Sequence, residues 1–130
     1  MSAYKMSGVS GDLEVFEDKL TITPRGVLGF MTKGLKGTKT IPFRSITAVQ
    51  HRKAGAILSG YLQLTLPGGI ESRGGVFSAA SDENTFMYAG VDKNALIEEV
   101  KTYIERRIQE LRDEDRGARV PAQQEARRMN

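Results

Sequence analysis

Hydrophobic and polar positions alternate in short runs along the first two thirds of the chain, and turn residues separate the runs. The clearest run is GYLQLTL, residues 60–66, in which Leu62, Leu64 and Leu66 fall on one face and the intervening residues on the other. Residues 13–16 (LEVF) and 20–24 (LTITP) flank a polar EDK segment and predict a hairpin. This pattern is typical of an all-β barrel or sandwich.

Further short segments complete a sheet of about seven antiparallel strands. Pro42 lies in one of them and predicts an edge or short strand, because proline cannot donate to a β-ladder. The segments are residues 27–32 (VLGFMT), 38–43 (TKTIPF), 46–52 (ITAVQHR), 73–79 (RGGVFSA) and 85–89 (TFMYA).

The period changes to three or four residues from position 92, which predicts one amphipathic helix that packs on the sheet. Asp92 or Asn94 is suited to cap its start, and Gly117 marks a stop. We therefore expect a flexible lead-in over residues 1–12, a domain over 13–115, and a disordered tail or linker over 116–130. The apolar positions that predict the helix are Leu96, Val100, Tyr103, Ile104, Ile108 and Leu111.

Length and composition narrow the class of protein. A chain of 130 residues is the size of one domain, and a hydrophobic fraction of 39% with a charged fraction of 27% is typical of globular proteins. The absence of cysteine excludes disulfides, thiolate metal sites and a cysteine nucleophile. No apolar run suits a signal peptide or a membrane span, and the chain starts Met-Ser rather than Met-Gly, so we expect a cytoplasmic protein whose contact with a membrane is peripheral.

Positive charge is concentrated in the front half of the chain. Residues 19–70 hold eight Lys or Arg and no Asp or Glu, although the net charge of the whole chain is only +3. A field of one sign attracts anions such as lipid headgroups, nucleic acid or an acidic protein patch. The alternative is that exposed lysines keep edge strands apart and the protein soluble. The residues predicted to bind an anion or a partner are Lys33, Lys36, Lys39, Arg44, Arg52 and Lys53.

The sequence offers no catalytic constellation. His51 is the only histidine, and without a second histidine or a cysteine it predicts no metal site; its neighbours Arg52 and Lys53 suggest that it joins the basic surface. The glycine-rich PGGIESRGG segment, residues 67–75, lacks the Gly-Lys-Ser/Thr of a P-loop, and Asp82 and Glu83 suit a turn. We predict no enzyme activity, no metal, no cofactor and no small-molecule substrate. Nucleic acid is disfavoured as a partner, because the aromatic rings near the basic residues suit the core.

The run IPFRSITAVQHRKAGAILSGYLQLTLPGGIESRGGVFSAASDENTFMY, residues 41–88, resembles the bacterial pleckstrin-homology-like (PH-like) domains of small actinobacterial and actinophage proteins, which often carry a SHOCT module. The resemblance implies two near-orthogonal antiparallel sheets capped by a C-terminal helix. In eukaryotic relatives the loop between the first strands grips phosphoinositides, and TKGLKGTK, residues 32–39, offers cations among glycines in that place. The end of this chain shows no SHOCT pattern.

The strand pattern, the charge distribution and the resemblance predict two alternative functions. The first is a PH-like adaptor that binds a protein or peptide, or forms a homo-oligomer, through a sheet edge and a helix overhang at Ile108 and Leu111. The alternative is peripheral binding of anionic lipid headgroups through the basic loop and strands.

Overall fold

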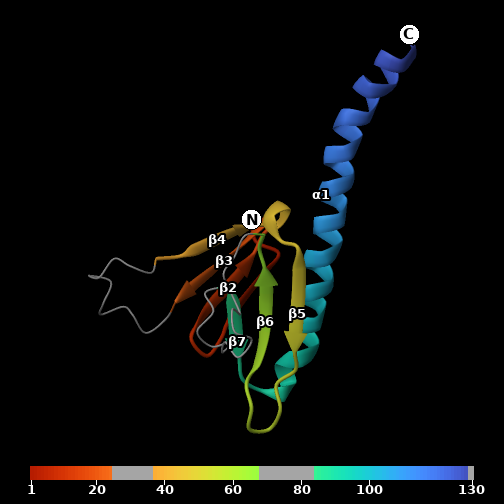
Figure 1. Ribbon diagram of the computed structural model, residues 1–130. Coiled ribbons are helices and arrows are strands. Elements are labelled where there is room, and N and C mark those ends of the chain that lie inside the picture. Colours follow the sequence, from red (N-terminus) through yellow and green to blue (C-terminus); the bar gives the residue numbers. More distant parts are fainter. Residues whose placement is uncertain (25–36, 68–83, 129–130) are drawn as a thin grey trace.

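The computed structural model describes residues 1–24, 37–67 and 84–128, and its architecture is two antiparallel sheets and one long C-terminal helix (Figure 1). The first sheet has the strand order β1-β2-β3-β4 and the second the order β5-β6-β7. The strands are β1 (Tyr4–Ser7), β2 (Gly11–Val15), β3 (Lys19–Pro24), β4 (Lys39–Pro42), β5 (Ala48–Arg52), β6 (Gly60–Thr65) and β7 (Thr85–Tyr88). The helices are η2 (Phe43–Ser45), η4 (Val91–Lys93) and α1 (Asn94–Arg128).

The first sheet is built on the predicted hairpin. β2 pairs with β3 in a register that sets Leu13 opposite Ile22 and Val15 opposite Leu20, and all four side chains are buried. β4 pairs with β3 and forms one edge of this sheet, as Pro42 predicts. The alternation of apolar and polar residues therefore places one face of the sheet in the core.

The second sheet is centred on β6, the strand with the cleanest alternation. Leu62 and Leu64 are buried, whereas the residues that alternate with them, Tyr61, Gln63 and Thr65, are half-buried. β5 and β7 flank it, and β7 also meets the first sheet, where the Val9 N–H donates to the Met87 carbonyl at 2.8 Å. The two sheets and the helix share one hydrophobic core.

Helix α1 covers this core from one side. Its buried positions are spaced by three or four residues, and the helix contacts β5 and β6 of the second sheet. It also reaches the edge of the first sheet, because the Tyr4 hydroxyl donates to Glu99 at 2.8 Å and the Tyr4 ring meets the Tyr103 ring edge-on at 5.4 Å. The buried helix residues are Ile97, Val100, Ile104, Ile108 and Leu111.

The structure differs from the predictions at both ends of the domain. Residues predicted as a flexible lead-in form β1 and the start of β2, because the β1 backbone pairs with β2 despite its polar composition. The helix does not end near residue 115: it continues through Gly117 and Pro121 to Arg128, where a tail was expected. Its distal part projects beyond both sheets (Figure 1).

One position of the predicted helix stripe also differs from the structure. Leu96, predicted in the apolar stripe, is exposed, and Ile97 occupies the core instead, whereas the later positions of the stripe from Val100 to Leu111 keep their predicted face. The strands predicted over residues 27–32 and 73–79 lie outside the described residues.

Candidate binding surface

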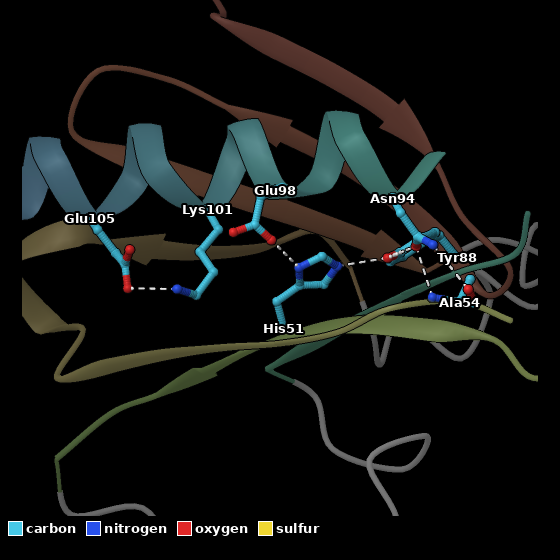
Figure 2. A network of polar contacts seen from close by, with 7 residues as sticks. All are labelled: His51, Ala54, Tyr88, Asn94, Glu98, Lys101 and Glu105. Atoms are coloured by element: carbon cyan, nitrogen blue, oxygen red, sulfur yellow. Dashed lines mark hydrogen bonds and ion pairs between the residues drawn. The ribbon is translucent and has the colours of Figure 1, made fainter. Parts of the chain in front are cut away.

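A partly buried polar network joins the second sheet to the start of α1 (Figure 2). Asn94, the first residue of α1, accepts the N–H of Ala54 at 2.8 Å and donates its own amide to the Ala54 carbonyl at 3.0 Å. The Tyr88 hydroxyl donates to the same Asn94 oxygen at 2.6 Å. Asn94 was predicted as a helix cap, but its side chain instead holds the backbone of the segment that follows β5.

His51 extends this network to the outer side of α1. Its Nε2 lies 2.7 Å from the Tyr88 hydroxyl and its Nδ1 lies 2.9 Å from Glu98 Oε1. The single Tyr88 proton goes to Asn94, so Nε2 must donate, and Nδ1 faces a carboxylate oxygen. Both ring nitrogens of His51 are therefore engaged by the network.

Two pKa shifts fit this arrangement. Burial raises the pKa of Tyr88 above its ordinary value, which keeps the hydroxyl protonated and able to donate. The hydrogen bond from His51 lowers the pKa of Glu98. The prediction that His51 joins the basic surface is wrong, because its side chain is only 4% exposed between β5, β7 and α1.

The network supports the connection between β5 and β6, residues 53–59, which we call the β5–β6 tip. Ala54 is buried against Asn94, and the Gly55 N–H donates to the Leu58 carbonyl at 2.9 Å, which closes a tight turn around Ala56 and Ile57. Beyond that turn the chain returns through Ser59, whose carbonyl accepts from Arg52 at 2.8 Å. The base of the tip is thus fixed by hydrogen bonds.

The outermost residues of the tip, Ile57 and Leu58, which we call its summit, are apolar and exposed to solvent. Ile57 is 92% exposed and Leu58 is 66% exposed. Val91 and Leu96, within three residues of Asn94, are also among the exposed large apolar side chains of the described chain, at 57% and 39%. The tip and the start of α1 lie at the same end of the molecule (Figure 1).

Two of the predicted binding residues lie at this end. Arg52 is the last residue of β5, and its guanidinium stacks over the Tyr61 ring at 4.8 Å from the centroid; Lys53 follows it at the start of the tip. Both residues are exposed. With Lys93 they give three cations in residues 52–60 and 91–98, against two carboxylates, Asp92 and Glu98.

The structure separates the other predicted cations from this pair. Lys33 and Lys36 lie outside the described residues. Lys39 is the half-buried first residue of β4, in the other sheet, and the start of β4 lies well away from the end of β5 (Figure 1). The described cations therefore do not form one continuous wall.

Arg44, which was predicted to bind an external anion or partner, is instead paired with the helix. Its guanidinium donates to both carboxylate oxygens of Asp115 on α1, at 2.9 and 3.0 Å, and lies 3.9 Å from Glu114. The hydrogen bond to Asp115 raises the pKa of Arg44. The charge of this residue is balanced by the helix, so Arg44 does not face an external anion.

The predicted overhang residues are not at an overhang. Ile108 and Leu111 are 8% and 4% exposed and belong to the core, because η2 and the end of the second sheet extend to this level of α1. The projecting part of the helix begins after them, near the Arg44–Asp115 ion pair.

Sequence reasoning did not single out Ile57 and Leu58. A signal was present, because the apolar run AIL stands between Gly55 and Ser59 in a turn with no alternation to place it in a strand. The Asn94–Ala54 contact had no local signal, since its partners lie 40 residues apart.

Two further findings concern the described parts of the chain. No group of three or more His, Cys, Asp or Glu residues among them is placed to hold a metal ion. Within the same residues, no helix is long and apolar enough to cross a membrane.

The chain is a two-sheet domain with a C-terminal helix, and comparison with known families assigns it further. It belongs to the family described as a domain of unknown function, DUF4429, whose profile matches residues 15–105. The match includes the whole polar network and the β5–β6 tip, and it ends before the helix projects. No curated protein and no solved structure matched the chain.

Proposed function

We propose that the chain is a non-catalytic binding module of the PH-like type, and that it docks peripherally on anionic membrane surfaces. The PH-like architecture is supported by sheets of four and three antiparallel strands followed by a helix that packs on their shared core. Closure of the two sheets into a barrel is part of this proposal.

The observation that carries the membrane proposal is the pairing of Arg52 and Lys53 with the exposed apolar summit of the β5–β6 tip. An anionic lipid surface attracts each nearby Lys or Arg by about 1 kcal/mol. Three cations at one end of the domain, opposed by two carboxylates, supply weak attraction of that order. Such attraction is screened by salt over about 10 Å at 0.1 M ionic strength.

Vesicle flotation tests this proposal. The protein should float with phosphatidylserine-containing vesicles at low ionic strength and much less with purely phosphatidylcholine vesicles. Lys53→Gln should weaken binding about fivefold, the equivalent of about 1 kcal/mol.

Arg44→Gln is the matched control, because it removes the same charge at a site already neutralised by Asp115. It should leave binding within about twofold of the unmodified protein. Equal binding to both vesicle types, or equal losses in the two variants, would contradict the proposal.

A second candidate function is protein binding or self-assembly through α1. It is favoured by the continuation of the helix beyond the sheets, in place of the overhang first expected at Ile108 and Leu111. Residues 112–118 hold no large apolar side chain, so a partner there would be recognised mainly by charge. Light scattering of the purified protein distinguishes this candidate, because an oligomer that is lost on truncation after residue 116 would support it.

A further inference from the structure

The membrane proposal leaves open how the domain is held once electrostatic attraction has brought it to a surface. We infer that the β5–β6 tip is an insertion element, in which Ile57 and Leu58 enter the interfacial region of an anionic bilayer. This inference rests on the proposed function and names the part of the protein that performs it.

Ile57 and Leu58 are both exposed to solvent. Large apolar residues at a solvated turn lose the contacts that a core would give them, and Ile57 at 92% exposed has almost no protein neighbour. Leu58 beside it is 66% exposed. A single exposed apolar residue is ordinary at a protein surface. Ile57 and Leu58 are adjacent at the end of a turn and form one apolar projection, which we call the wedge.

Hydrogen bonds hold the base of the tip in place. The Ala54 backbone makes two hydrogen bonds with the Asn94 side chain, one as donor and one as acceptor, and the Tyr88 hydroxyl donates to Asn94. The Gly55–Leu58 and Arg52–Ser59 hydrogen bonds close the turn above it. A summit fixed in this way loses little conformational entropy when it enters the interface.

The charge around the tip selects an anionic bilayer as its partner. Arg52 and Lys53 lie at the base of the wedge, so they would meet headgroup phosphates when the summit reaches the acyl boundary. The acids of the neighbouring helix start, Asp92 and Glu98, are outnumbered by Arg52, Lys53 and Lys93, and Glu98 is hydrogen-bonded to His51. A protein partner would need its own acidic rim around a small apolar socket, whereas an anionic bilayer presents both layers in this order.

Tryptophan fluorescence offers a direct test, because the chain contains no tryptophan. Leu58→Trp should show a blue-shifted emission when phosphatidylserine vesicles are added, and lipids brominated at shallow acyl positions should quench it. Gln109→Trp, at an exposed position two residues before Leu111 on the helix, is the matched control and should keep its aqueous spectrum.

The double variant Ile57→Ser/Leu58→Ser gives the second readout. Both side chains are exposed, so the fold should be retained, which circular dichroism checks. Binding to phosphatidylserine vesicles should fall roughly thirtyfold, the loss expected when two partly inserted apolar side chains are removed. The residual binding should be more sensitive to salt than that of the unmodified protein, because only the electrostatic part remains.

The outcomes separate this inference from the function on which it rests. If the unmodified protein does not bind anionic vesicles, the proposed function fails and the inference fails with it. If it binds but Leu58→Trp keeps an aqueous spectrum and the serine variant binds equally well, insertion alone is refuted. If light scattering shows a dimer that the serine variant dissociates, while no vesicle shifts the Trp spectrum, the tip contacts a second copy and the inference is overturned.

Discussion

Replacing Asn94 with alanine should destabilise the domain more than any other single change of a polar side chain at the start of α1. The substitution removes three hydrogen bonds, two with the Ala54 backbone and one from Tyr88. It also leaves the Ala54 amide and carbonyl to find water in a partly buried site.

The expected loss follows from these bonds. A hydrogen bond of this kind contributes about 1 kcal/mol net, so the free energy of unfolding should fall by about 2–3 kcal/mol. For a domain of this length each kcal/mol shifts the Tm by about 4 °C, which gives a decrease of about 8–12 °C. Urea unfolding and a thermal melt, both followed by circular dichroism, would measure the two quantities.

Two variants make the result interpretable. Gln109→Ala removes an exposed side-chain amide whose one bond is to Asp113 at 3.0 Å, and it should cost no more than about 0.5 kcal/mol. Asn94→Asp keeps an oxygen that accepts from Ala54 but loses the amide donor, so its effect should be intermediate. Equal stability of Asn94→Ala and Gln109→Ala would refute the reasoning that the network supports the β5–β6 tip.

The remaining predictions concern pH and steric fit. Because His51 lowers the folded-state pKa of Glu98, this contact contributes stability that is fully present above the unfolded pKa of 4.5 and is lost as pH falls through the lower folded pKa. Glu98→Gln should therefore flatten the acid side of a plot of unfolding free energy against pH. An unchanged acid side would contradict the contact between His51 and Glu98. Gly60→Ala should destabilise the domain by about 2 kcal/mol or more, because a Cβ there would lie 2.6 Å from backbone atoms of Arg52 and Ala54. Gly55→Ala is its control, since nothing lies within 4 Å of a Cβ at that position, and equal unfolding midpoints for the two variants would show that close packing at Gly60 is unimportant.

Part of the predicted binding surface depended on reading charge along the chain alone. Lys53 and Arg44 have the same sequence signature, a cation in a segment without acids, yet only Lys53 lies beside the exposed tip. Arg44 meets Asp115, 71 residues away, and is neutralised. A count of local charge carries no information about partners supplied by a distant helix.

The same limit explains His51. Its neighbours Arg52 and Lys53 suggested an exposed basic site, but alternation along β5 turns its side chain toward α1, where Glu98 and Tyr88 satisfy both ring nitrogens. The direction of one side chain was readable from the strand period. The identity of its partners was not.

Elements whose cause is local could be predicted from the amino-acid pattern. Apolar alternation set Leu62 and Leu64 in the core, Pro42 set β4 at an edge, and the three-to-four spacing set Val100 and Ile104 on the buried side of α1. Tertiary structure alone decided which distant groups met, because contacts such as Asn94 with Ala54 arise only after the helix has packed on the second sheet. That packing also decided what stayed outside: it buried Ile108 and Leu111 under η2 and left Ile57 and Leu58 in solvent, since burial depends on what the rest of the chain covers rather than on how apolar a residue is.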